Sequence, residues 1–384
     1  MHHLVGGFKP CGGKAAHVGK TFLRRQQRNK TFDESERFFF DQMHKEWWND
    51  QAKEKQTWCD ILQKIAGGKT YSLHDYNKHR FNFLCKNYEF LFFEKMKKEG
   101  LEEKDKKNDI TINILDVGCG GGILCEYMRK NIPYFFLKRD IVGRDARCNN
   151  VSGRSVHINI EGIDVSSKLI DVARRRQQVE GADYIGMGHL GEENPPHIYS
   201  TRKMNPESFN QEKEANSANN QKENNPSNNL NVHINQRYYN CDITDLTKRS
   251  KRDGKKYNIV VSSEVIEHVP NGKKEEYVKC ISQLCSPEAL VVFTTIDKNL
   301  MSYLYSIVLA EYVTGMVKKG THNYDQFIGS DELSELCALF DLQNISTEHA
   351  VYIPFVRDYF STRWLKLLYL SAFVYRGGAT LMSG

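Results

Sequence analysis

The stretch ILDVGCGGGILCEYM, residues 114–128, places four glycines within five positions, between an apolar run and a pattern of helical spacing. The apolar run from Thr111 to Val117 predicts a short buried strand. Apolar residues then recur on one helix face, at Ile123, Leu124, Tyr127 and Met128. Glycine permits positive φ and lets a ligand reach main-chain N–H groups at the positive end of a helix. The stretch therefore predicts a nucleotide-binding strand–turn–helix unit, with an ordinary tight turn as the alternative.

The glycine spacing discriminates between classes of nucleotide. A dinucleotide site has the pattern Gly-x-Gly-x-x-Gly. Gly118 and Gly120 fit its first two positions, but Ile123 stands where the third glycine belongs. No Gly-Lys-Ser/Thr follows, so a phosphate loop is excluded. The segment LDVGCGGG instead resembles the first motif of class I S-adenosylmethionine-dependent methyltransferases, in which the glycines make room for the methionine part of the cofactor.

Composition sets broad limits on the class of protein. The chain has 384 residues, a formal net charge of +6 and ten cysteines, none of them in a CxxC pair. One or two domains, reduced thiols and no nucleic-acid partner are expected. No run of about 20 apolar residues predicts a membrane-spanning helix. Residues 1–31 are basic and contain no acid, which predicts a mitochondrial transit peptide or a disordered tail.

Strand-like and helical segments alternate along the rest of the chain. Further strands are expected at residues 156–164, 237–243, 257–263, 289–296, 348–356 and 368–376. This order predicts an α/β fold, a doubly wound, mostly parallel, seven-stranded Rossmann-like sheet with helices N-terminal to it. We expect a single domain over residues 32–375. It is interrupted by a basic spacer at about 132–154 and a disordered, asparagine-rich insertion at about 189–236.

Two aspartates follow expected strands at the edge where such sheets bind ligands. Asp164 ends the second strand, where an acid hydrogen-bonds the ribose hydroxyls of a nucleotide. Asp242 ends the third strand, where an adenine is expected to lie. Each aspartate has an alternative role as the N-cap of the helix that follows it.

A group of metal-binding residue types follows the fourth expected strand, in the segment SSEVIEHV. Glu264, Glu267 and His268 would share one face if this turn were helical. Two carboxylates and an imidazole suit a divalent cation. The alternative is that the two carboxylates are capping or solvated groups and that His268 is a structural histidine.

Several segments together resemble the O-methyltransferases of ubiquinone biosynthesis. They occur in the order LDVGCGGG, GIDVS, SSEVIEHV, FTTIDKNLMSYLYSIVLAEYV and KKGTHNYDQFI. The resemblance covers residues 32–130 and 155–375 apart from the insertions. It implies methylation of polyprenyl catechols and demethylubiquinol, with S-adenosylmethionine and Mg²⁺ as cofactors. It also implies a membrane surface and other enzymes of the pathway as partners, at the matrix side of the mitochondrial inner membrane.

The resemblance also implies roles for individual residues. The cofactor contacts that it and the fold indicate are Arg80, Gly118, Gly120, Asp164, Asp242 and Ser263. The implied magnesium ligands are Glu264, Glu267 and His268, and the candidates for catalysis are His268 and His322. His322 has a structural role as an equal alternative. The segment from Asn77 to Arg80 reads NKHR where the family has NPLR, so the loop that carries Arg80 departs from the family pattern.

The apolar segment at residues 298–320 is expected to lie on a membrane surface, where a polyprenyl substrate resides. The alternative is a buried helix packed on the sheet. Two other functions remain open at this point. One is a different S-adenosylmethionine-dependent methyltransferase, and the other is a non-catalytic, membrane-bound scaffold of a biosynthetic complex.

Overall fold

The computed structural model describes residues 30–43, 71–99, 110–138, 155–180, 199–200, 231–313, 320–353, 358–362 and 370–377. The predicted targeting or disordered tail, residues 1–31, lies outside these ranges except for its last two residues. So does most of the predicted insertion.

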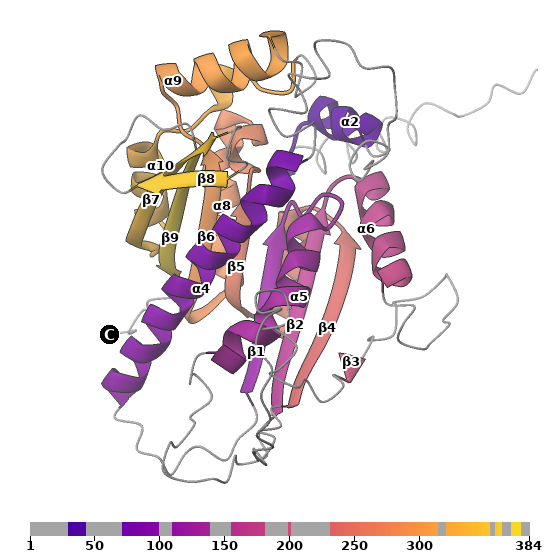
Figure 1. Cartoon of the computed structure of the whole chain (residues 1–384), viewed down its shortest axis with the longest axis vertical. Coiled ribbons are helices and arrows are strands. Elements are labelled where there is room, and N and C mark those ends of the chain that lie inside the picture. The colour runs from indigo at the N-terminus through magenta and orange to yellow at the C-terminus, as the bar shows by residue number, and fades with distance from the viewer. Residues whose placement is uncertain are drawn as a thin grey trace, which may run out of the picture.

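One sheet runs through the molecule, with the strand order β3-β4-β2-β1-β5-β6-β9-β7-β8 (Figure 1). The strands are β1 (Ile110–Val117), β2 (Ser155–Asp164), β3 (Tyr199–Ser200), β4 (Asn231–Asn240), β5 (Tyr257–Ser263), β6 (Cys285–Ile296), β7 (Gln343–Ile353), β8 (Asp358–Thr362) and β9 (Leu370–Gly377). The five adjacent strands β4, β2, β1, β5 and β6 are parallel to one another. The strands β3, β7, β8 and β9 pair antiparallel. The parallel strands therefore bring their carboxyl ends to one edge.

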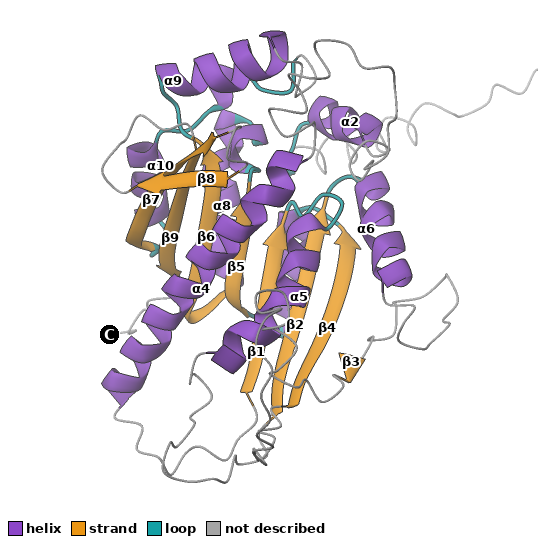
Figure 2. Ribbon diagram, viewed as in Figure 1, coloured by secondary structure: helices purple, strands orange, loops and turns teal. Residues whose placement is uncertain are grey.

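Helices cover both faces of the sheet (Figure 2). The helices and helical turns are α2 (Glu34–Met43), α4 (Tyr71–Glu99), α5 (Ile123–Lys138), α6 (Ser167–Glu180), α7 (Ile243–Asp253), η4 (Ile266–His268), η5 (Asn271–Lys273), α8 (Lys274–Leu284), α9 (Leu300–Ser302), the π-helical η6 (Tyr303–Val313), η7 (Tyr324–Gln326) and α10 (Ser330–Ala338). Buried side chains of α4, α5 and α6 form one core with the sheet, and those of α7, α8 and α10 form another on the opposite face. Helix α2 lies above the carboxyl ends of the parallel strands (Figure 1).

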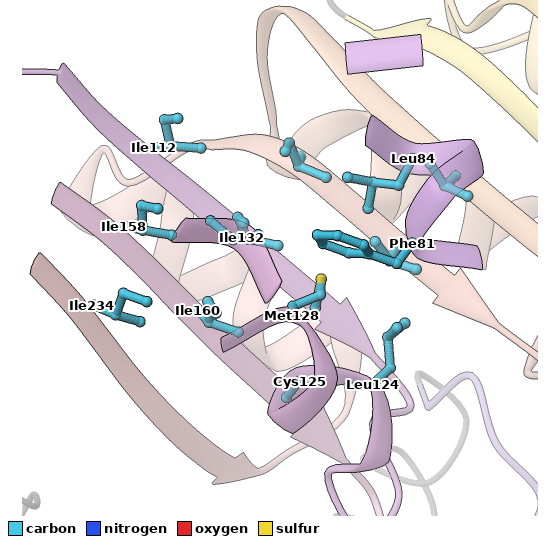
Figure 3. Packing of buried hydrophobic residues seen from close by; sticks show 14 of the residues in the cluster. Phe81, Leu84, Ile112, Leu124, Cys125, Met128, Ile132, Ile158, Ile160 and Ile234 are labelled. Carbon is cyan, nitrogen blue, oxygen red and sulfur yellow. The ribbon is translucent and has the colours of Figure 1, made fainter. Parts of the chain in front are cut away.

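Alternating strand residues supply the two cores. Ile158 and Ile160 of β2 face α5 and α4, where Met128 and Phe81 pack against them (Figure 3). Ile163 of the same strand belongs to the core on the other face. A parallel sheet buried on both faces requires such nearly continuous apolar strands.

The predicted α/β fold is confirmed, with two strands more than the seven expected. The additions are β3, which has two residues and pairs with β4, and β8, which pairs with β7. Both are short, and both lie at an end of the strand order. Neither changes the parallel centre that positions the site.

Two boundaries of the predicted interruptions are wrong. The insertion was expected to extend to residue 236, but β4 begins at Asn231 because Val232 and Ile234 alternate into the core beside β2. The spacer was expected to begin at residue 132, but α5 continues to Lys138 and buries Ile132. At β4 a few apolar residues at alternate positions outweigh the polar composition around them, whereas α5 continues through a largely apolar segment.

We predict that replacing residues 203–229 with a four-residue linker preserves the fold. Ser200 pairs antiparallel with His233, so the described residues that flank the removed segment lie on adjacent strands that a short connection can join. The entropy of loop closure varies only with the logarithm of loop length, so the free energy of unfolding should change by about 2 kcal/mol or less. Urea unfolding measures the change. Loss of soluble, cooperatively unfolding protein would contradict the prediction.

Candidate active site

The glycine turn connects β1 to α5 and is held against the end of β2. The N–H groups of Gly118 and Cys119 donate to the Ile163 carbonyl oxygen at 2.8 and 3.0 Å. Gly118 has φ +73, and a Cβ at this position would lie 2.4 Å from Cγ2 of Val265. Both the backbone conformation and the close approach therefore require glycine here.

Asp164 connects this turn to the helix after β2. One carboxylate oxygen accepts from the Gly120 N–H at 2.9 Å, and the other accepts from the Ser166 N–H at 2.8 Å. Burial raises the pKa of Asp164 to about 6, although these two backbone hydrogen bonds oppose the rise. The alternative role as helix N-cap falls to Ser166 instead, whose hydroxyl accepts from the Leu169 N–H at 3.1 Å. Asp164 lines the pocket, and its predicted contact with a ribose stays a prediction.

A pocket opens at the carboxyl edge of the sheet, around the glycine turn. Its lining includes most of the residues predicted from the sequence, namely Arg80, Gly118, Gly120, Asp164, Asp242, Ser263, Glu264 and His268. The site is thus assembled from β1, β2, β5, α4 and the ends of β4 and η4. Glu267 and His322 do not line the pocket.

Asp242 takes its alternative role as the N-cap of α7 and also lines the pocket, whereas the predicted adenine beside it stays a prediction. Its Oδ1 accepts from the Thr244 N–H at 2.9 Å and caps α7. Its Oδ2 accepts from the hydroxyl of Thr31 at 2.8 Å. Thr31 precedes α2, so this contact fixes the N-terminal segment over the pocket.

Arg80 and Ser263 lie together on the pocket wall. An Nη of Arg80 donates to the Ser263 hydroxyl at 2.6 Å, and the guanidinium lies 5.0 Å from the ring centroid of Tyr76. The other Nη donates to the side-chain oxygen of Asn77. The departure from the family pattern between residues 77 and 80 therefore does not displace Arg80 from the pocket.

The three predicted magnesium ligands do not form a metal site in this arrangement. Glu264 has φ +55 and lies outside the short turn η4, so the expected common helix face does not exist. Its carboxylate accepts from Thr294 at 2.9 Å, whereas that of Glu267 accepts from Thr295 at 2.9 Å. Within the described ranges no three His, Cys, Asp or Glu side chains could hold a metal ion. The structure does not support the prediction of magnesium.

Glu267 and His268 have altered proton affinities. Burial and, next, the charge of Glu264 raise the pKa of Glu267 to about 8. Burial lowers the pKa of His268, but a hydrogen bond to Glu36 and the charges of Glu267 and Glu264 outweigh it, so the pKa is raised overall. Nδ1 of His268 lies 3.5 Å from Oε2 of Glu36. Carboxylates from two elements thus favour the protonated imidazole.

His322 lies next to His268 but does not line the pocket. The two rings are stacked with their centroids 6.2 Å apart. Nδ1 of His322 lies 2.9 Å from Oε1 of Glu311, which also accepts from the His322 N–H at 2.8 Å. Burial opposes ionisation of Glu311, but its hydrogen bonds with His322 and Gly320 lower its pKa overall. The predicted role of His322 in proton handling has no direct contact with the pocket to support it.

The N-terminal helix α2 forms part of the pocket wall, which was not predicted from the sequence. Thr31 and three side chains of α2, Glu36, Arg37 and Phe40, line the pocket. The ring of Phe40 meets that of His268 edge to face, with centroids 5.1 Å apart. An amphipathic pattern indicates which face of α2 is buried but not what that face packs against. The sequence therefore could not indicate that α2 lines the pocket.

Several known proteins are similar to this chain. A family model described as a methyltransferase domain matches residues 76–347. The chain is similar to the ubiquinone biosynthesis O-methyltransferase of Coxiella burnetii (strain RSA 493 / Nine Mile phase I), with 26% identity over 68% of this chain and 77% of that protein. Its Pasteurella multocida (strain Pm70) counterpart is 23% identical over 90% of this chain and 98% of that protein. Among solved structures, magnesium protoporphyrin IX methyltransferase from Synechocystis PCC 6803 with bound SAH aligns with a TM-score of 0.42 and 12% identity, over 89% and 98% of the two chains.

We predict that Gly118→Ala weakens binding of S-adenosylhomocysteine by more than about tenfold, because the added Cβ forces Val265 and the turn apart. Gly254→Ala is a matched control. Gly254 has φ +70 as well, but nothing lies within 4 Å of its added Cβ. Calorimetric titration of both variants separates backbone strain from the close approach. Equal affinities in the two variants would contradict the assigned turn.

A second prediction concerns Asp116, which is buried beside the turn. Burial raises its pKa to about 6. A carboxyl whose pKa is raised on folding destabilises the protein when ionised, so stability increases as pH falls from 7.5 through 6. Asp116→Asn should remove this dependence, on the order of 2–3 kcal/mol between pH 7.5 and 4.5. Urea unfolding at several pH values measures it, with the exposed Asp171→Asn as control. Identical pH slopes in wild type and Asp116→Asn would refute it.

Proposed function

This chain belongs to the methyltransferase domain family, and we propose that it methylates a hydroxyl oxygen of polyprenyl catechols and of demethylubiquinol in ubiquinone biosynthesis. The observation that carries the proposal is the pocket in which the glycine turn, Asp164 and Asp242 meet His268. The names of its relatives support the substrate class, and so does the order of the segments from LDVGCGGG to KKGTHNYDQFI.

The reaction is an in-line transfer of a methyl group. S-adenosylmethionine supplies a methyl group on a sulfonium, which a phenolate oxygen attacks to give a methyl ether and S-adenosylhomocysteine. Gly118 and Gly120 carry no side chain that would block the approach of the ligand, and the carboxylates of Asp164 and Asp242, which line the same pocket, would hold its nucleoside. Arg80, held by Ser263 and Asn77, forms part of the wall beside the acceptor oxygen.

His268 is the proton acceptor in this proposal. A phenol with a pKa of about 10 is a poor nucleophile at neutral pH unless its proton is removed. Glu36, Glu267 and Glu264 raise the pKa of His268, so its neutral imidazole is a stronger base than that of an ordinary histidine. His268 must first lose its own proton, so turnover should rise with pH through this pKa. The carboxylates of Glu264 and Glu267 accept from Thr294 and Thr295 in this structure, so no residue role in this mechanism depends on a divalent cation.

The test is transfer of a labelled methyl group to a catechol that carries a short prenyl tail. The wild type should methylate it, and the fully methylated analogue should accept nothing. His268→Ala should reduce turnover by about 100-fold or more while S-adenosylhomocysteine affinity is preserved. Parallel assays with a chelator show whether a cation contributes. Tight cofactor binding without transfer to any catechol would contradict the proposed substrate.

A membrane surface is the proposed location of the substrate. Helices α9 and η6 present an apolar strip whose residues, Leu300, Tyr303, Leu304 and Leu309, are 40–70% exposed. Ile307 differs, since it packs against the core cluster that contains Tyr76 and Phe327. None of the helices described is long and apolar enough to cross a bilayer. The strip instead suits shallow contact with lipid. The matrix side of the mitochondrial inner membrane remains a prediction.

We predict that Leu300→Glu combined with Leu304→Glu reduces binding to anionic vesicles and turnover of a long-tailed substrate by about tenfold or more, because each leucine loses apolar burial in the lipid. Turnover of a soluble, short-tailed substrate should persist. Leu339→Glu is the matched control, since Leu339 is 71% exposed at the end of α10 and outside the strip. Vesicle flotation and activity measure both effects. Normal vesicle binding by the double variant would rule out the strip as the contact.

A further inference from the structure

A second cavity, of about 410 Å³, lies at the edge of the sheet between α6 and α7. It shares no lining residue with the pocket described above. In the described part of the chain, β4 has only the two-residue strand β3 on its outer side. Side chains of α6 complete this edge, since Gln177 and Arg174 donate to the carbonyl oxygens of Gln236 and Tyr238 at 2.9 and 2.8 Å.

Four cationic side chains line the cavity, namely Arg174, Arg237, Arg249 and Lys255, against two acidic ones, Glu161 and Asp253. The charge of Glu161 is compensated, because its carboxylate accepts from Lys255 Nζ at 2.6 Å and from the Tyr257 hydroxyl at 2.7 Å. Asp253 accepts from Nε of Arg252 at 2.8 Å. The positive charge of the three arginines is therefore in excess.

None of these three arginines forms an ion pair with a carboxylate among the described residues, although the charge of Arg249 acts on Asp253. The hydrogen bond of Arg174 goes to a neutral carbonyl, and the Arg249 guanidinium lies 5.7 Å from the ring centroid of Tyr239. The Nε atoms of Arg174 and Arg237 are buried without a hydrogen-bond partner in the same ranges. Buried donors without acceptors destabilise a fold, and so does the mutual repulsion of guanidinium groups. An oxyanion in the cavity would relieve both.

We propose that this cavity binds a small molecule that carries a phosphate or diphosphate group. The planar guanidinium presents paired N–H donors that match phosphate oxygens. The cavity volume falls in the range of small-ligand sites, and Tyr238, Tyr239 and Gln178 add polar and aromatic surface to its wall. The cavity is separate from the pocket proposed for the methyl donor and acceptor. This proposal therefore does not depend on the identity of the methylated substrate.

Calorimetric titration with inorganic pyrophosphate tests this proposal on the full chain. Saturating S-adenosylhomocysteine keeps the first pocket filled, and acetate at equal ionic strength serves as the monoanion comparison. The wild type should bind pyrophosphate and not acetate. Arg249→Gln and Arg237→Gln should each weaken binding by about tenfold, as expected for one lost charge-assisted hydrogen bond. Arg249 is exposed, so its substitution should leave the fold intact.

Arg175→Gln provides the matched control, because Arg175 is an exposed arginine of α6 that does not line the cavity. It should bind pyrophosphate as the wild type does. Affinity for S-adenosylhomocysteine, measured on each variant, verifies folding independently of the cavity. The proposal is overturned if wild-type protein gives no pyrophosphate binding, or if Arg175→Gln weakens it as much as Arg249→Gln.

Discussion

The hydrogen bonds between the glycine turn and the end of β2 are the constraint on which the site depends. Ile163 accepts from Gly118 and Cys119, and the Asp164 carboxylate accepts from Gly120. These contacts are possible because β1 and β2 are parallel and in register, with Val117 beside Ile163. Both strands end at one edge, so a glycine-rich turn and a carboxylate meet there. The rest of the pocket is added around this junction.

The N-terminal segment closes the pocket through polar contacts rather than through a large apolar interface. Thr31 donates to Asp242, Glu36 lies beside His268, and Asp41 accepts from Ser166. Each contact reaches a residue that lines the pocket or follows one in sequence. The segment therefore completes the site electrostatically, because the carboxylate of Glu36 is the strongest influence that raises the pKa of His268. A cofactor must enter beneath or beside these contacts.

Sequence periodicity predicted the parts of this structure that depend on local pattern. The central strands, the glycine turn and Asp164 follow from apolar spacing and from the residue types that a close ligand requires. The start of β4 was missed because Val232 and Ile234 are isolated among asparagines, and only pairing with β2 makes them a strand.

The structure does not support the three predicted magnesium ligands for a different reason. Their spacing assumed a helix, but Glu264 takes a left-handed backbone conformation and its carboxylate turns to Thr294. The role of α2 depends on tertiary contacts that no local pattern records.

In the proposed function the pocket at the carboxyl edge, around Gly118, Asp164 and Asp242, holds the methyl donor beside His268. A crystal structure of the protein with S-adenosylhomocysteine tests this most directly. The account predicts the ribose at Asp164, the adenine at the end of β4 and the homocysteine chain along the glycine turn. Density for S-adenosylhomocysteine at any other surface, with the turn and Asp164 untouched, would contradict it.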